Sequence, residues 1–172
     1  MEHFDNVKYV NTGNMIGDAV LNQYFSICKA AGVEMTVVGR FGVDTGIDET
    51  DLCVILTNLI SNAYEAAEKS RARKIKIELS SFGDNQFISI SNTASGETQA
   101  RNGRLVSEKT TKKDKETHGF GIGNVIEAVK RSRGTVAWET EKSGDSLMVY
   151  ARVRLPAGHG EMPHLSMERN ER

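Results

Sequence analysis

Three polar side chains recur on one side of the longest predicted helix. Asn58, Asn62 and Glu65 are spaced four and three residues apart, so they share a helical face. That face lies roughly 110° around the helix from the apolar stripe, at the border of the core. Neutral amide oxygens suit a magnesium ion that keeps phosphate oxygens and waters as its other ligands. The spacing equally fits a polar helix flank on which Glu65 pairs with Lys69.

A glycine-rich run, Gly119-Phe120-Gly121-Ile122-Gly123, stands before a second amphipathic segment. Glycine lets a backbone approach a ligand closely, and the first N–H groups of a helix can meet phosphate oxygens. We therefore expect a turn that opens a helix. The spacing matches neither the P-loop nor the dinucleotide fingerprint, and a flexible loop without a ligand is the alternative.

Residues 93–117 contain almost no apolar side chains, and Lys109–Lys115 form a basic run. A stretch of about 25 residues without an obvious element is unusual inside a compact domain, and such loops are often functional lids. A lysine in this run, next to a phosphate site, would neutralise a triphosphate. The competing interpretation is a solvated polar loop.

The elements that must position these residues follow from hydrophobic periodicity. Thr12 or Asn14 would cap a first helix, and the chemistry-bearing helix carries a stripe of leucine, isoleucine and alanine. The predicted helices are 15–31, 49–69 and the segment from the glycine-rich turn to about 133, and the predicted strands are 33–38, 74–80, 87–92, 135–140 and 146–155.

The order of these elements predicts the fold class. Tight hairpins join several strands, which favours a mixed, mostly antiparallel sheet. The helices should lie on one face of it, as a two-layer α/β sandwich. A doubly wound Rossmann sheet would need strict alternation of strands and helices, and the order lacks it.

Composition narrows the class of protein. The chain has 172 residues, 38% hydrophobic and 26% charged, with a formal net charge of -1, as in one ordinary globular domain without a strong attraction to nucleic acid. Cys28 and Cys53 lie in predicted helices among apolar residues, which predicts buried, reduced thiols in a cytosolic protein. The cysteines and histidines show no zinc-ligand spacing. No apolar run reaches the ~20 residues that span a bilayer.

The order of motifs resembles the GHKL superfamily, which includes gyrase, the heat-shock chaperone ATPase, histidine kinases and the MutL repair proteins. Residues 58–66 resemble its N box, Ser91-Asn92-Thr93 stands in the place of its G1 box, and His118–Gly123 resembles its G2 box. The resemblance covers Gly13 to Leu155 and implies the Bergerat (GHKL) fold.

One motif departs from the family pattern. The usual G1 box is Asp-x-Gly-x-Gly, whereas this chain has Asn92 in the aspartate position and only Gly96 nearby. An amide carbonyl still accepts a hydrogen bond from an adenine N–H, without charge assistance. The variant G1 box, the Thr-Thr-Lys-Lys-Asp lid and the segment Thr12-Gly13-Asn14 with Asp18 and Leu21-Asn22 resemble the receptor kinases of peptide quorum sensing, of the accessory-gene-regulator type.

By resemblance, the reaction is phosphoryl transfer from Mg-ATP to a histidine on a dimerisation helix, in two-component signal transduction. The resemblance assigns Asn62 and Asn58 to magnesium and phosphate, Asn92 to adenine, Gly119, Gly121 and Gly123 with Lys112 and His118 to the phosphates of ATP or ADP, and Glu65 to a water near the metal.

The resemblance also predicts the organisation of the chain. Residues 1–12 would end a linker from a dimerisation region, 13–155 would form the catalytic domain with its lid at about 93–117, and 156–172 would be a polar tail. No histidine here has the setting of a phosphoacceptor, so the acceptor would precede residue 1. The parent would be a homodimeric, membrane-anchored receptor that signals to a response regulator, and this cytoplasmic domain would contact neither membrane nor nucleic acid.

Two rival functions are open. A serine kinase of the anti-sigma-factor type shares the fold, but it should carry the standard Asp-x-Gly-x-Gly. A degenerate nucleotide-binding module without catalysis is favoured by the altered G1 box, and opposed by Asn62 and the three glycines.

Overall fold

The computed structural model describes residues 9–42, 46–95, 98–101, 104–107, 112–143 and 146–157. Within those ranges, the elements along the chain are α1 (Met15–Ala31), β1 (Glu34–Gly39), α2 (Glu49–Lys69), β2 (Lys74–Phe82), β3 (Asn85–Ala94), β4 (Thr98–Arg101), β5 (Arg104–Ser107), α3 (Lys112–Arg131), β6 (Thr135–Ser143) and β7 (Ser146–Pro156).

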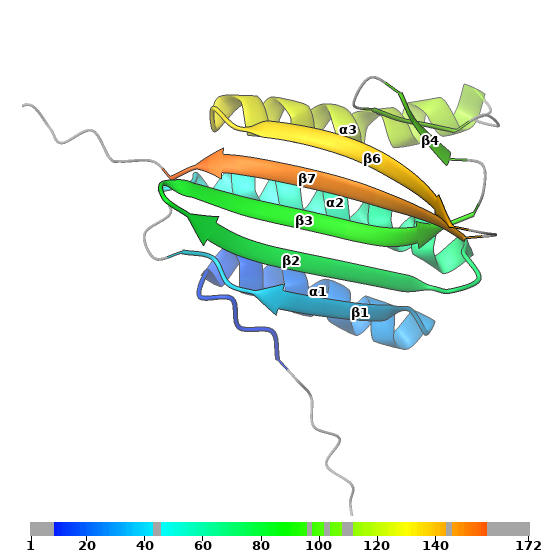
Figure 1. Ribbon diagram of the computed structural model, residues 1–172, viewed down its shortest axis with the longest axis horizontal. Coiled ribbons are helices and arrows are strands. Elements are labelled where there is room, and N and C mark those ends of the chain that lie inside the picture. The colour runs from blue at the N-terminus through cyan, green and yellow to red at the C-terminus, as the bar shows by residue number, and fades with distance from the viewer. Residues whose placement is uncertain are drawn as a thin grey trace, which may run out of the picture.

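The main sheet of the described residues has the strand order β1-β2-β3-β7-β6. The edge strand β1 runs parallel to β2, and every other neighbouring pair in that sheet is antiparallel. The short strands β4 and β5 form a separate antiparallel pair. Figure 1 shows α1, α2 and α3 on the same face of the sheet. The predicted two-layer α/β sandwich with a mixed, mostly antiparallel sheet is therefore confirmed.

The first two helices have the predicted bounds, because local signals define their ends. The Asn14 side chain accepts a hydrogen bond from the Gly17 N–H at 2.8 Å, and Asp48 accepts one from the Asp51 N–H at 2.9 Å. Both satisfy N–H groups that a helix leaves unpaired at its start. At the end of α1, Gly32 adopts a left-handed φ of 68°, which favours glycine.

The core forms where the apolar stripe of α2 meets the inward face of the sheet. Alternation along the strands places one set of side chains under α2, and each buried leucine or isoleucine contributes about 1.5–3 kcal/mol. The buried residues at this contact include Leu52, Ile55, Leu56, Leu59, Ile60, Ala63 and Ala67 from α2, Ile75, Ile77 and Leu79 from β2, Ile88 and Ile90 from β3, and Val149, Ala151, Val153 and Leu155 from β7.

The structure corrects the expectation that residues 93–117 hold no regular element. β3 continues to Ala94, β4 and β5 form a hairpin, and α3 already begins at Lys112. Lysine and glutamate are good helix formers, so the charged run is compatible with a helix that has no apolar stripe of its own. Part of the predicted lid (96–97, 102–103 and 108–111) lies outside the described residues.

The expected turn at Gly119–Gly123 is also corrected, because these residues lie inside α3. Each glycine disfavours a helix by about 1 kcal/mol relative to alanine, which is why the local pattern predicts a turn. Tertiary contacts override that preference, since Val125, Ala128 and Val129 of the same helix are buried in the core. The helix ends at Arg131, two residues before the predicted end.

The two cysteines differ, whereas the sequence predicted both to be buried. Cys28 is fully buried, and this burial raises the pKa of its thiol. Cys53 is exposed on the flank of α2 that faces away from the core. In the part of the chain that the structure describes, no helix is long and apolar enough to cross a membrane. Residues 1–8 of the predicted linker (1–12) and residues 158–172 of the predicted tail (156–172) lie outside that part.

Candidate functional site

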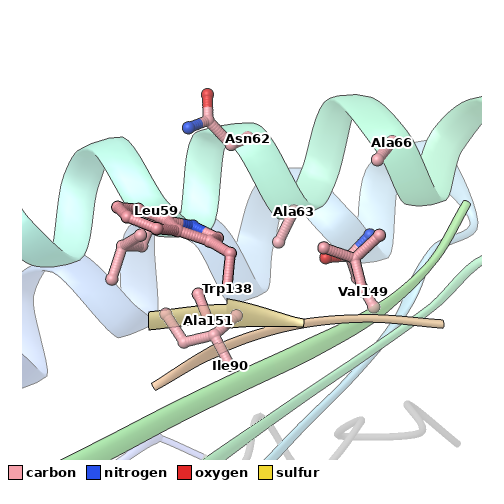
Figure 2. Close-up of a pocket in the computed structure, with 9 residues that line it drawn as sticks. Leu59, Asn62, Ala63, Ala66, Ile90, Trp138, Val149 and Ala151 are labelled. Carbon is pink, nitrogen blue, oxygen red and sulfur yellow. The ribbon is translucent and has the colours of Figure 1, made fainter. Parts of the chain in front are cut away.

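A small pocket lies between α2 and the inward face of the sheet. Its walls come from α2, β3, β6 and β7: Leu59, Asn62, Ala63, Ala66, Ile90, Asn92, Trp138, Val149 and Ala151. Figure 2 shows the Trp138 indole beside Leu59, between the helix and the sheet. The cavity measures about 40 Å³, far below the roughly 300–1,000 Å³ of a typical ligand pocket. A ring system can therefore enter only if lining side chains move.

Asn92 is a polar residue at a core-facing position of β3. It pairs with Ile75 of β2 and Val149 of β7, and it is only 5% exposed. Its Nδ2 donates to the Thr93 carbonyl at 3.0 Å. That bond fixes the orientation of the amide, so Oδ1, which accepts from no described residue, is the end that is free to accept from a ligand.

A hydroxyl network joins the end of α2 to the end of β3 beside Asn92. Ser70, the C-cap of α2, donates to the Ala67 carbonyl at 2.8 Å, and its hydroxyl lies 2.6 Å from that of Thr93. The Lys74 N–H in turn donates to the Thr93 hydroxyl at 3.0 Å. The pocket wall from α2 and the wall from β3 are thus held in register by buried bonds.

Asn58 and Asn62 of α2 lie next to Gly121 of α3. A Cβ placed on Gly121 would lie 3.1 Å from Asn58 Oδ1 and 3.7 Å from Asn62 Oδ1. Both amide oxygens therefore face the same point of α3. The Asn58 Nδ2 donates to the Val54 carbonyl of α2 at 2.7 Å, and Asn58 Oδ1 lies on the side of Gly121. A residue larger than glycine at position 121 would crowd these oxygens.

The remaining predicted site residues lie along α2 and α3. Glu65 is half-buried one turn beyond Asn62, and it has an interaction partner. Gly123 is exposed, with open space around it. Lys112, His118 and Gly119 belong to the first half of α3, and the side chains of that half lie outside the described part of the structure.

An ion pair clamps the start of α2 to the end of α3. The Arg131 guanidinium donates to Asp51 Oδ1 through Nε at 3.0 Å and through an Nη at 2.5 Å. The Ser132 hydroxyl approaches Asp51 Oδ2 at 3.4 Å. Asp51 is buried, and its carboxylate raises the pKa of Arg131. This ion pair ties the start of α2 to the end of α3.

Sequence reasoning missed most of the pocket wall. Trp138 was predicted only as part of a strand, although alternation along β6 places it on the inward side.

None of the nine lining residues is charged. Once its lining side chains move apart, the pocket suits a neutral group that offers one donor to Asn92. The amide oxygens of Asn58 and Asn62 can bind a hard cation nearby. Among the described residues, no cluster of three histidine, cysteine or acidic side chains could hold a metal instead.

The chain matches a known protein family. Residues 47–149 match the family model described as GHKL domain, which is more than half of the chain. The matched range begins just before α2 and ends in β7, so it contains both helices that carry the site. Among curated proteins, no sequence matches this chain.

Solved structures with the same fold include three histidine kinases. The nucleotide-free catalytic domain of histidine kinase ThkA has a TM-score of 0.58 and 18% identity, over 86% of this chain and 94% of that one. Histidine kinase AdeS of Acinetobacter baumannii has a TM-score of 0.55 and 16% identity, over 83% of this chain and 64% of that one. The mycobacterial sensor histidine kinase MprB has a TM-score of 0.55 and 15% identity, over 80% of this chain and 93% of that one. At these identities the likeness establishes the fold alone.

Proposed function

Because the chain belongs to the GHKL domain family, we propose that it is the ATP-binding catalytic domain of a two-component histidine kinase. It binds Mg-ATP and transfers the γ-phosphoryl group to a histidine outside this chain. The observation that carries the proposal is the meeting of Asn58 and Asn62 with Gly121 beside a neutral pocket that ends at Asn92. The fold shared with histidine kinase catalytic domains supports it.

The adenine ring occupies the pocket under α2. Asn92 Oδ1 accepts from the exocyclic amine, because its Nδ2 is already engaged with Thr93. Adenine presents a donor at that position and guanine an acceptor, so this orientation of the amide favours ATP over GTP. The aliphatic floor of Ile90, Val149 and Ala151 suits an uncharged ring.

Asn62 and Asn58 are the residues that would hold magnesium. Their converging amide oxygens are hard ligands, and magnesium usually keeps waters and substrate phosphates in its other positions. When bound, the ion neutralises charge on the phosphates. Glu65, one turn farther along α2, orients a water at this edge of the site.

Phosphate binding requires a change in α3. The N–H groups of Gly119, Gly121 and Gly123 lie within a helix, where the i→i−4 pattern occupies them. They reach phosphate oxygens only if the first half of α3 unwinds, and the weak helix preference of glycine lowers the barrier to that step. Lys112 and His118 then face the triphosphate, and the predicted lid closes over it between the end of β3 and residue 117.

The acceptor histidine and its partners belong to the rest of the kinase. We place the acceptor on a dimerisation region before residue 1, in a homodimeric, membrane-anchored receptor of the accessory-gene-regulator type with a cognate response regulator. The subclass rests on the sequence resemblance of the segment from Thr12 to Asn22. In the structure this segment is ordered by its own polar side chains: Asn22 exchanges hydrogen bonds with Val10 at 2.8 and 2.9 Å, and Asp18 accepts from Thr12 at 2.6 Å. Residues 13–155 form the catalytic unit.

A degenerate nucleotide-binding module is the second candidate. The neutral Asn92 in place of an aspartate, and the helical glycine segment, favour it. An anti-sigma-factor-type serine kinase has less support, because the standard glycine pattern after Asn92 is missing. Transfer of radiolabelled phosphate from ATP to a separately supplied dimerisation segment distinguishes these candidates. The chain alone should acquire no acid-labile label, and label on the chain itself would show that the acceptor is misplaced.

Calorimetry tests the binding step. ADP with magnesium should give one site, and Asn62→Ala should lose at least tenfold in affinity while its dependence on magnesium disappears, since a metal ligand is removed. Ser61→Ala, one residue away on α2 and outside the pocket lining, is the matched control and should bind as wild type. Absence of heat with millimolar nucleotide would refute the proposed function. Unchanged magnesium dependence in Asn62→Ala would show that this face is merely a polar flank.

A further inference from the structure

Trp138 occupies the pocket from the edge of the sheet. It lies on β6, an outer strand, opposite Ala151 of β7, and it is the single tryptophan of the chain. Its side chain is 5% exposed and is the largest of those that line the cavity. A cavity of about 40 Å³ cannot admit a purine unless this indole or its neighbours shift.

The polar atom of the indole has no partner in the described structure. Trp138 Nε1–H makes no hydrogen bond to a described residue, although a buried tryptophan usually finds one. Among described residues, Arg73 Nε is the one polar side-chain atom that is both enclosed and unpaired. The Trp138 N–H is therefore not sealed in the core, and it borders space that water or a ligand can reach.

From the place of Trp138 in the pocket lining we propose that it is a base-contacting residue of the nucleotide pocket, whose indole face contacts the purine ring and supplies affinity. The inference rests on the proposed function and adds a residue to it. Asn92 supplies the hydrogen-bond acceptor at one wall, and Trp138 supplies a flat aromatic surface at another, beside Leu59 (Figure 2). Contact between an aromatic side chain and a base is strong and tolerates any base, so it supplies affinity while Asn92 selects the base.

The alternative is that Trp138 has a purely structural role in the core. Trp138 and its strand partner Ala151 both belong to the apolar core, so burial by itself does not distinguish the two roles. Trp138 lines the same cavity as Asn62 and Asn92, and its N–H is not among the enclosed unpaired atoms of the described residues. Both observations favour the pocket role, because a donor enclosed in an apolar core usually has a partner.

Intrinsic fluorescence tests the proposal on the unmodified protein, because all tryptophan emission comes from position 138. Titration with ADP and magnesium should quench or shift the emission, with the same Kd that calorimetry gives. Binding heat without a change in emission would overturn the role of Trp138 and leave the proposed function intact. Absence of both signals would refute the proposed function itself.

Two variants separate aromatic contact from filled volume. Trp138→Leu should raise the Kd for ADP by about tenfold or more, and Trp138→Phe should stay within about threefold of wild type, because only the latter keeps an aromatic face. Tyr150→Leu removes an aromatic ring from the opposite face of the sheet and is the matched control. Thermal unfolding confirms that each variant is folded. Wild-type affinity in Trp138→Leu would overturn the proposal.

Discussion

The helices α2 and α3 face each other across the candidate site, yet different forces determine them. α2 has a capping aspartate, an unbroken apolar stripe and predicted bounds that the structure reproduces. α3 contains three glycines, and its contact with the core comes from Val125, Ala128 and Val129 near its C-terminal end. The first helix is specified along its whole length by its own pattern, whereas the second depends on what it packs against.

This difference corresponds to the division of tasks in the site. α2 holds Asn58 and Asn62 rigidly, because its opposite flank is buried against the sheet. α3 brings a glycine to those amides and is tied to α2 by Arg131 and Asp51. In the proposed function the first half of α3 releases its backbone amides to a ligand, and weak intrinsic stability in that half would favour this step.

Removal of the clamp should have the largest effect on this arrangement. Asp51→Asn leaves Arg131 without a charged partner, and we expect a loss of about 2 kcal/mol in the free energy of unfolding, which is the range for a hydrogen bond to a charged group. Arg131 is 57% exposed and stays solvated, so the loss should not be larger. Denaturant unfolding measures it.

The matched control for the clamp is Glu139→Gln. It removes the charge from an exposed ion pair with Arg152 on the open face of the sheet, and it should change stability by less than about 1 kcal/mol. Equal losses in the two variants would mean that the link between α2 and α3 is no stronger than an ordinary surface contact.

Two glycine variants test the helical state of α3 with a smaller effect. Gly123 has open space around it and a helical backbone, so Gly123→Ala should stabilise the protein by about 0.5–1 kcal/mol. Gly121→Ala should gain less, because its Cβ would meet Asn58 Oδ1 at 3.1 Å. Thermal unfolding compares the two. If Gly123→Ala destabilised the protein, the result would favour the turn that the sequence predicts over the helix.

The smallest expected effect is a difference in reactivity between the two thiols, which is measured without altering the fold. Cys53 on the outer flank of α2 should react quickly with an alkylating reagent. Cys28 should react only on unfolding, because burial both shields the thiol and raises its pKa, which lowers the fraction of reactive thiolate. Mass spectrometry should find one modified cysteine in the native protein and two in denaturant. Rapid modification of Cys28 would show that α1 separates readily from the core.

Periodicity in the sequence was enough for the helices and strands that carry dense apolar patterns. It predicted α1, α2 and the β2–β3 and β6–β7 hairpins, as well as the side of α2 on which Asn58 and Asn62 lie. It failed for β4, β5 and the start of α3, because these segments are mostly polar and show no hydrophobic periodicity. Cys53 was misplaced for a related reason, since apolar neighbours in sequence do not share its side of the helix.

By itself, the sequence determined the fold class, the polar face of α2 and the family to which the chain belongs, because each depends on residue types at short, regular spacing. Only the tertiary structure decided that Gly119–Gly123 lie within a helix, that Asn92 Oδ1 accepts from no described residue, and that Trp138 shares a pocket with Asn62. Those three facts depend on contacts between residues far apart in the chain. Local propensity cannot encode such contacts, since their free energy exists only when the core is assembled.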